Sequence, residues 1–245
     1  MPSDKTMEKS KNFQGFSPET GAFLWELSFH NERPWFLSHK EEFERVLHRP
    51  FQALAADCLR GMDARYPELG FQVHLSRIYR DARRLFGRGP YKDHMWLILH
   101  VGSRHAQGPA FWFELGPATY NYGLGFWDAS SAVMDELRRR IDANPAAFER
   151  LVGELAPGWK LWGEPYKRPK GERGPVIDPW YNRRFLSVGW EKDLGGEAFE
   201  ARLPELLCER FAALMELHAL FVSAWTAGSA AASANSRTER EIERT

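Results

Sequence analysis

Apolar side chains recur at helical spacing through the first third of the chain. Ser17-Pro18-Glu19 predicts a helix start, because Ser17 is suited to capping free backbone amides and Pro18 needs no N–H at the first helical position. A second helix is predicted from Pro34, and Pro50 is expected to kink or divide it before the apolar stripe continues to Met62. The first third is therefore predicted to be helical.

The pattern becomes strand-like from Gly70 onward. Four segments alternate or are rich in apolar and aromatic residues, namely 71–75, 95–101, 110–115 and 119–127. The short polar connection between the second and third segments favours antiparallel pairing of the strands that flank it. These segments predict an antiparallel sheet formed from the middle of the chain.

Helical patterns return after the fourth strand segment. Ser130 or Ser131 is expected to start one helix and Asn144-Pro145 another, since both sites combine a capping residue with an apolar stripe. Residues 197–225 predict a long amphipathic helix, with Pro204 near its first turns. Between these helices, residues 158–179 are rich in Gly, Pro and basic residues and predict a long irregular segment, followed by a strand at 184–190.

The fold class expected from this order is α+β, with a central antiparallel sheet from the middle of the chain covered by N-terminal and C-terminal helices. A length of 245 residues is sufficient for one large domain, which we place at residues 13–225. Residues 1–12 are polar and residues 226–245 are of low complexity with a charged end, so both are expected to be flexible.

The overall charge is balanced, with 33 basic and 33 acidic residues. A protein dedicated to duplex DNA is normally markedly basic, so duplex DNA is not an expected partner. No run of about eighteen apolar residues and no signal-peptide core are found, which predicts a cytoplasmic protein without a membrane partner. Cys58 and Cys208 lack metal or redox spacing and are expected to be buried thiols.

Standard signatures of nucleophilic, phosphate-loop and metal chemistry are missing from the sequence. There is no Gly-x-Ser-x-Gly motif, and Gly123-Leu-Gly125 is too short for a phosphate-binding loop. His94, His100 and His105 lack the one-face spacing of a His-Glu-x-x-His site. We therefore expect neither a metal nor a cofactor, and the sequence leaves open whether the protein is an enzyme.

Basic residues gather between Arg77 and Lys92. Six of these sixteen residues are Arg or Lys, against a single acid, Asp81. Gly87, Gly89 and Pro90 predict a turn here, and glycine lets a backbone approach a ligand closely. Arginine adds a planar fork that matches carboxylate or phosphate. The segment is therefore typical of a site that holds an anionic group.

A second basic stretch, Tyr-Lys-Arg-Pro-Lys-Gly at residues 166–171, lies within the irregular segment. Two positive loops in a neutral protein suggest one shared positive face. The sequence does not show whether the two loops meet.

A series of motifs follows one order along the chain. The motifs are Phe13-Gln-Gly-Phe16 with Phe23-Leu24, Asn31 followed by Trp35-Phe36, Arg77-Ile-x-Arg80-Asp81-x-Arg83, Pro90-Tyr91-Lys92, Gly123-x-Gly125, the Arg138 helix, and Pro169-Lys170-Gly171 with Asp178-Pro179. This series resembles the domain of unknown function 2461 family. The resemblance covers about residues 13 to 225 and implies a single-domain, intracellular protein of bacterial or fungal type with no assigned activity. Within the turn, Arg84, Phe86 and Arg88 stand where the family pattern has Phe and two lysines.

We interpret the basic segments as a pocket for a small anionic ligand that bears a phosphate or carboxylate group. If the site is catalytic, the expected reaction is transfer or hydrolysis at the bound group, with Asp81 or Tyr91 handling a proton. Two alternatives stay open: single-stranded nucleic-acid binding through basic loops with aromatics, and a protein-interaction scaffold. The sequence gives no oligomeric state. The predicted ligand-binding residues are Arg77, Arg80, Arg83, Tyr91, Lys92, Arg138 and Lys170.

Overall fold

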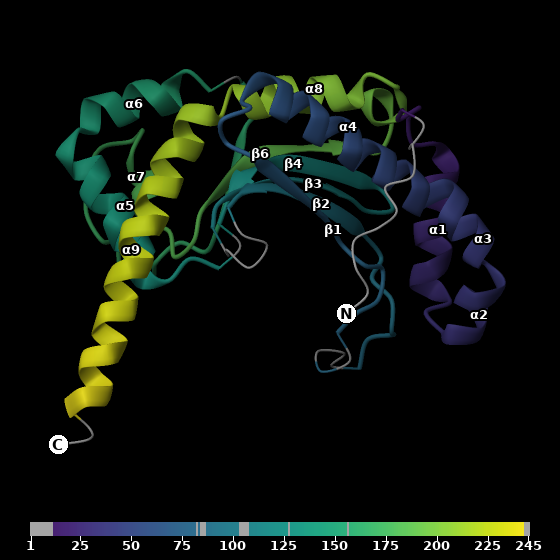
Figure 1. Ribbon diagram of the computed structural model, residues 1–245, viewed down its shortest axis with the longest axis horizontal. Coiled ribbons are helices and arrows are strands. Elements are labelled where there is room, and N and C mark those ends of the chain that lie inside the picture. The colour runs from purple at the N-terminus through teal and green to yellow at the C-terminus, as the bar shows by residue number, and fades with distance from the viewer. Residues whose placement is uncertain are drawn as a thin grey trace. The chain divides into compact units, whose positions relative to one another are not determined.

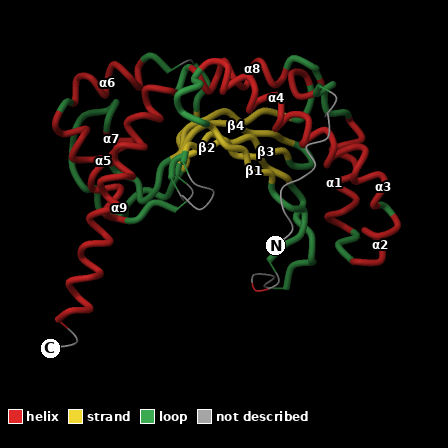
Figure 2. The backbone as a smooth tube through the Cα atoms, in the orientation of Figure 1, coloured by secondary structure: helices red, strands yellow, loops and turns green. Residues whose placement is uncertain are grey.

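The computed structural model describes residues 12–81, 83, 87–102, 108–126, 128–155 and 157–242, with side chains through residue 233. Helices come from both ends of the chain and strands from its middle (Figures 1 and 2). The helical elements are α1 (Pro18–Phe29), α2 (Arg33–Ser38), α3 (Lys40–Phe43), the π-helical turn η1 (Glu44–His48), α4 (Arg49–Arg65), α5 (Ser131–Ala143), α6 (Pro145–Gly153), α7 (Asp178–Tyr181), the 3-10 turn η3 (Gly196–Phe199), α8 (Leu203–Ala212) and α9 (Met215–Ile242).

Six strands of the described chain form one antiparallel sheet in the order β1-β2-β3-β4-β6-β5. Val73 of β1 lies opposite Leu99 of β2, and Leu161 of β5 lies opposite Val188 of β6. The α+β fold class predicted from the sequence is confirmed. The strands are β1 (Phe71–Leu75), β2 (Met95–Val101), β3 (Ala110–Leu115), β4 (Thr119–Gly125), β5 (Lys160–Trp162) and β6 (Ser187–Asp193).

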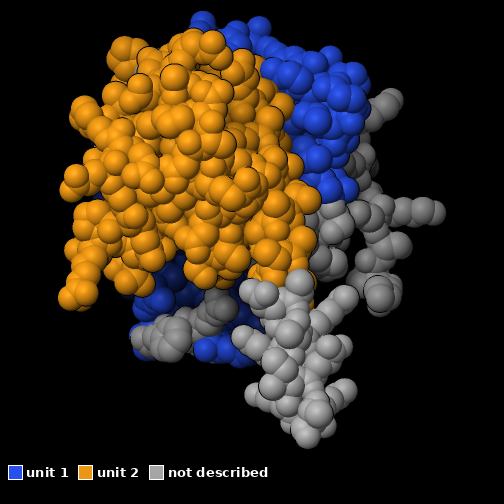
Figure 3. Space-filling view, turned by 90° about the vertical axis from the view of Figure 1, so that its left-hand side faces the viewer, with its two compact units in different colours: residues 1–102, 112–122, 191–209 blue, residues 103–111, 123–190, 210–245 orange. Residues whose placement is uncertain are grey.

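The chain divides into two compact units, which Figure 3 colours blue and orange. The first comprises residues 1–102, 112–122 and 191–209, and the second comprises residues 103–111, 123–190 and 210–245. Strands β3, β4 and β6 contribute residues to both units, so the units are not separated at a linker. A single domain over residues 13–225 stays a prediction, and of the predicted flexible segment 1–12 only Asn12 belongs to the described residues.

The first unit is built on a sheet with two unlike faces. Helix α4 packs on β1 and β2. Leu97 and Leu99 of β2 are fully buried, whereas Trp96 between Met95 and Leu97 is only half-buried. Because side chains alternate along a strand, the half-buried Trp96 lies on the face opposite the buried leucines.

Pro50 shapes the helical segment that leads into α4. In a regular α-helix the carbonyl of Val46 accepts a hydrogen bond from residue 50, but Pro50 has no N–H. The hydroxyl of fully buried Thr20 on α1 donates to this carbonyl at 2.8 Å instead. The helical segment therefore continues through the π-helical turn η1 and past Pro50, and the Val46 carbonyl is satisfied by Thr20 of α1.

In the second unit, α9 packs closely along α5. A side-chain carbon at Gly228 would lie 2.5 Å from the Cα of Val133, so glycine permits this approach. Helix α9 continues to Ile242, although the sequence predicted loose chain from residue 226. The Ala-rich composition of this segment explains the difference, since alanine has the highest helix propensity.

Two further elements differ from the sequence prediction. Residues 197–225 form η3, α8 and α9 rather than one long helix, and α8 begins at Leu203, next to Pro204. Proline fits the first turn of a helix but not its interior, which accounts for this start. The predicted irregular segment 158–179 contains the short strand β5, whose period-2 pattern is too brief to recognise. No described helix is both long and apolar enough to cross a membrane.

Candidate functional site

The segment 77–92, which we call the basic turn, extends the hairpin of β1 and β2 in the first unit. Tyr79 pairs with Tyr91 in an antiparallel bridge. The Arg80 N–H donates to the Pro90 carbonyl and the Lys92 N–H donates to the Ile78 carbonyl, both at 2.8 Å. Backbone pairing therefore brings Arg80 and Lys92, which are far apart in sequence, onto neighbouring legs of one turn.

Asn31, between α1 and α2, fastens the basic turn to the helices. Its side-chain N–H donates to the Tyr91 carbonyl and its side-chain oxygen accepts from the Tyr91 N–H, both at 2.9 Å. A side-chain carbon at Gly89 would overlap Asn31, so this glycine makes room for Asn31. The Tyr91 ring stacks on Phe36 of α2, with centroids 4.2 Å apart. The position of the turn is thus set by backbone contacts that any ligand would find already formed.

Arg80 and Lys92 lie close together under partial cover. Arg80 donates from Nε to the Tyr91 carbonyl at 2.7 Å, and its Nη2 lies 3.7 Å from Oδ1 of Asp93. The Lys92 ammonium lies 5.5 Å from the centre of the Trp96 ring. Burial lowers the pKa of Lys92, and the charges of Arg80 and Arg77 lower it further, with Glu114 acting in the opposite direction. Three cations therefore share one small region.

A row of polar and aromatic side chains continues from Lys92 across the sheet face that carries Trp96. The Trp112 indole N–H of β3 donates to Oδ1 of Asn121 on β4 at 2.6 Å. Asn121 in turn donates to Glu114 at 3.3 Å. Trp112 and Glu114 alternate with buried neighbours on β3, as Trp96 does on β2, so all three lie on the face opposite the buried core, and Lys92 contacts Trp96 there. The candidate site is therefore a cationic corner beside a face bearing two tryptophans.

Arg83 and Asp81 form a solvent-exposed ion pair with each other. Arg83 donates from Nε and Nη2 to the two carboxylate oxygens of Asp81, at 3.1 and 2.8 Å. This hydrogen bonding raises the pKa of Arg83, whose side chain is 89% exposed. Both oxygens of Asp81 are engaged, so the predicted proton-transfer role of Asp81 gains no support from these contacts.

Tyr91 contacts Arg80 through its backbone carbonyl and not through its ring. Only 2% of the residue is exposed. Burial raises the pKa of the Tyr91 phenol, Tyr79 raises it further, and Arg33 lowers it in part. The phenol is therefore protonated at neutral pH, and its predicted role in proton transfer stays a prediction.

Arg138 of α5 lies in the second unit and is buried, with 5% of its surface exposed. Its guanidinium donates to the carbonyls of Tyr181 and Arg183 at 2.8 and 2.9 Å and pairs with Asp135 at 2.7 Å. A buried arginine with these partners holds the chain around α7 in place.

Lys170 also belongs to the second unit and is exposed. Its ammonium lies 4.9 Å from the centre of the Tyr166 ring, and the Arg138 guanidinium lies 5.1 Å from the same centre. The structure thus brings Arg138 and Lys170 together around Tyr166. The other five predicted residues belong to the first unit, so the predicted site residues fall into two groups.

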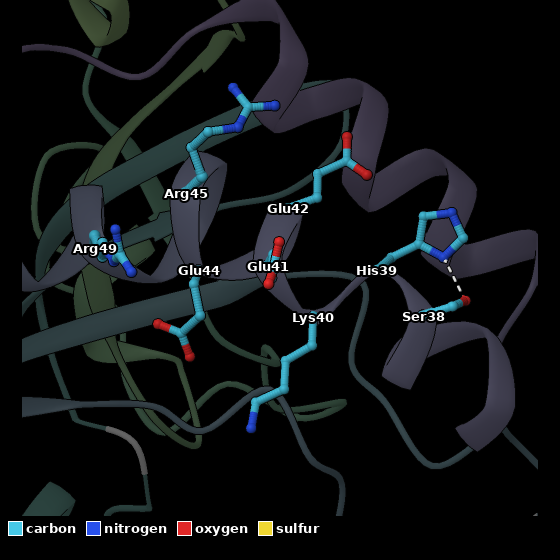
Figure 4. A pocket seen from close by; sticks show the side chains of 8 residues that line it. All are labelled: Ser38, His39, Lys40, Glu41, Glu42, Glu44, Arg45 and Arg49. Carbon is cyan, nitrogen blue, oxygen red and sulfur yellow. Dashed lines mark hydrogen bonds between the residues drawn. The ribbon is translucent and has the colours of Figure 1, made fainter.

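A hollow of about 780 Å³ lies elsewhere in the first unit, along α3 and η1 (Figure 4). Its lining has Lys40, Arg45 and Arg49 balanced by Glu41, Glu42 and Glu44, and Arg45 is also paired with Glu19 of α1. A lining without net charge has no preference for an anion. None of the residues that line the hollow belongs to the basic turn. Because its lining has no net charge, the hollow is a weaker candidate for an anion-binding site than the basic turn.

Trp96, Trp112 and Glu114 are site residues that sequence reasoning did not single out. They come from strands that only the folded sheet places beside Lys92. The available signal was their alternation with buried neighbours on β2 and β3, which marks the second face of a sheet. Within the described part of the chain, no group of three or more His, Cys, Asp or Glu side chains is arranged to hold a metal ion.

The protein is an α+β protein whose basic turn is held by Asn31, which lies between two helices. The sequence matches the family described as Conserved hypothetical protein (DUF2461) over residues 19–218, and the chain belongs to this family. The resemblance drawn from the motifs is thereby confirmed. A search of curated proteins found no match to the chain.

Proposed function

We propose that the protein binds a small anionic ligand, bearing a phosphate or carboxylate group, at Arg77, Arg80 and Lys92. One observation carries the proposal: Lys92 is half-buried, and its pKa is lowered by burial and by the charges of Arg80 and Arg77. Lys92 keeps a lowered pKa although Glu114 acts in the opposite direction, so this acid does not offset the effects of burial and of the two arginines. A bound anion relieves this repulsion, so the energy of the arrangement favours its uptake.

The side chains near Arg77, Arg80 and Lys92 indicate the chemical class of the rest of the ligand. Trp96 and Trp112 offer aromatic surface on the adjoining sheet face, and Glu114 offers a hydrogen-bond acceptor. Aromatic side chains bind flat apolar groups well. We therefore favour a ligand whose anionic group is joined to a planar, apolar body over a free inorganic ion.

Isothermal titration calorimetry with phenyl phosphate, benzoate and inorganic phosphate tests the proposal. We expect phenyl phosphate or benzoate to bind more tightly than inorganic phosphate. Lys92→Gln is expected to weaken binding about tenfold or more, because a charge-assisted hydrogen bond contributes roughly 1.5–3 kcal/mol. Arg83→Gln in the same turn and Lys170→Gln in the second unit are the matched controls, and both should keep the wild-type affinity.

Two results would contradict the proposal. One is the lack of measurable heat with all three probes at millimolar concentration. The other is equal affinity of the wild type and Lys92→Gln, which would place any binding elsewhere. Weakening by Lys170→Gln but not by Lys92→Gln would move the site to the group around Tyr166.

Single-stranded nucleic acid is a second candidate, favoured by one observation. Trp96 and Trp112 lie on the same sheet face as Lys92, an arrangement that suits stacked bases beside a phosphate backbone. This candidate predicts that a labelled oligonucleotide binds at low salt and dissociates steeply as salt is raised. A flat titration at low salt would exclude it.

A further inference from the structure

The two cysteines of the chain meet in the core of the first unit. Cys58 lies on α4 and Cys208 on α8, and they are 0% and 1% exposed. The Cys208 thiol donates to the Cys58 carbonyl at 3.5 Å, and each thiol shifts the pKa of the other. Two sulfur atoms from opposite ends of the chain are therefore neighbours.

Gly61 and Arg65 of α4 give Cys208 an unusual environment. A side-chain carbon at Gly61 would lie 2.6 Å from the Cys208 sulfur and 3.5 Å from Nη1 of Arg65. The sulfur and the guanidinium thus approach the same glycine. Arg65 is exposed and Gly61 half-exposed, so Cys208 lies just beneath the surface at this point, next to a cation.

The two thiols are chemically unequal. The hydrogen bond from Cys58 lowers the pKa of Cys208, and Arg65 lowers it further against the effect of burial. The hydrogen bond with Cys208 and burial raise the pKa of Cys58 well above its ordinary value. Cysteine reacts as a thiolate, which a nearby cation favours, so we assign Cys208, beside Arg65, as the nucleophile and Cys58 as the resolving thiol.

We propose that Cys58 and Cys208 form a thiol-oxidation site that takes a small hydroperoxide, such as hydrogen peroxide, and closes to a disulfide between α4 and α8. The Cys208 thiolate attacks one peroxide oxygen and the O–O bond breaks, giving a sulfenic acid and, after protonation, water. The Cys58 sulfur then attacks the Cys208 sulfur, forming the S–S bond and releasing the sulfenic oxygen as a second water. Two thiols are oxidised and one peroxide is reduced, which balances the electrons.

The matched environments argue for this chemistry over simple packing. Apolar packing alone is satisfied by two protonated thiols and needs no neighbouring cation. The resulting disulfide would link α8 covalently to α4, the helix that packs on β1 and β2.

The test oxidises the full chain with hydrogen peroxide and follows both thiols by mass spectrometry. Because the chain has two cysteines, an intramolecular loss of two hydrogen atoms identifies the Cys58–Cys208 disulfide. We expect this product in the wild type, reversed by dithiothreitol. In Cys58→Ser, dimedone should label Cys208 as a sulfenic acid, whereas in Cys208→Ser dimedone should label nothing.

Arg65→Gln provides a surface variant that does not disturb the core. We expect it to slow disulfide formation several-fold, while Arg49→Gln, an exposed substitution on the same helix, leaves the rate unchanged. Two free thiols in the wild type after prolonged peroxide treatment would overturn the proposal. So would equal rates in the wild type and Arg65→Gln, or dimedone labelling of Cys58 in Cys208→Ser.

Discussion

Asn31 shows how one side chain fixes the geometry of the basic turn. Its amide offers a donor and an acceptor in the spacing of a neighbouring strand, and it satisfies both backbone groups of Tyr91. The carbonyl of Tyr91 also accepts from Arg80. The arginine is therefore positioned through a backbone group that Asn31 holds in place.

Asn31→Ala is expected to lower the free energy of unfolding by about 1–3 kcal/mol, because it leaves part-buried backbone groups without their partner. Urea unfolding measures this loss. Arg83→Ala serves as the control and should leave the midpoint unchanged, since its ion pair with Asp81 lies in the solvent. Equal midpoints for Asn31→Ala and the wild type would show that the turn is held by other contacts.

Buried His218 of α9 makes the free energy of unfolding depend on pH in the acid range. It is 3% exposed and stacks on Phe111, with centroids 5.0 Å apart. Burial lowers its pKa from 6.5 to about 4. The unfolded chain takes up this proton first, so the stabilising effect of the neutral ring is complete above pH 6.5 and is lost as the pH falls towards 4.

Replacing His218 by Phe is expected to remove this contribution. Each titrating proton changes stability by about 1.4 kcal/mol per pH unit within the window, so His218→Phe should flatten the fall in stability between pH 6.5 and about 4. Urea midpoints measured above and within the window test it. A fall as steep as that of the wild type would assign the acid sensitivity to other groups.

The site residues were predictable from the sequence only in part. The clustering of Arg77, Arg80 and Lys92 was visible as charge in one segment. The engagement of Arg83 by Asp81 was not, because a local charge count does not show which cations are already paired. Trp96 and Glu114 were missed because their nearness to Lys92 arises from strands that pair only in the folded sheet.

At the scale of elements, the contact between α5 and α9 gives an unusual glycine prediction. Replacing an interior helix glycine by alanine normally stabilises a helix by about 1 kcal/mol. At Gly228 the new methyl group would lie 2.5 Å from the Val133 Cα and 2.8 Å from the Ala132 carbonyl oxygen. The two helices would have to move apart.

Gly228→Ala is therefore expected to destabilise the protein by about 1–3 kcal/mol despite its better helix propensity. Gly153→Ala is the matched control, since no atom lies within 4 Å of the new carbon at the end of α6, and it should be neutral or stabilising. Thermal unfolding followed by circular dichroism separates the two. A higher melting temperature for Gly228→Ala would contradict the close approach.

Periodicity predicted the individual elements better than their joins. The bounds of β1, β2 and β3 match the sequence prediction, because the first segment alternates, the second is mostly apolar and the third is rich in aromatic residues. The divisions among α3, η1 and α4 depend on the pairing of Thr20 with a carbonyl freed by Pro50, a contact between distant segments. The end of α9 was mispredicted for a different reason, because its alanine-rich continuation was interpreted as low-complexity chain although alanine favours a helix.

At the scale of the whole molecule, a chain of balanced charge carries two separate cationic groups, one in each compact unit. Around Tyr166, the buried Arg138 already donates to two backbone carbonyls and pairs with Asp135. Around Lys92, burial and the charges of Arg80 and Arg77 lower the pKa of the lysine, and Asp93 and Glu114 are nearby acids. The second arrangement is the one that gains most from a bound anion, which is why we place the ligand there.

The pKa of Lys92, measured by NMR of its side-chain nitrogen, tests this claim most directly, with Lys92→Arg assigning the resonance. Burial and the two arginines lower this pKa, so we expect Lys92 to lose its proton at a lower pH than the exposed lysines. Saturating phenyl phosphate should raise the pKa of Lys92, since an anion favours the charged form. A pKa equal to that of exposed lysines and unchanged by phenyl phosphate would contradict an anion site at Lys92.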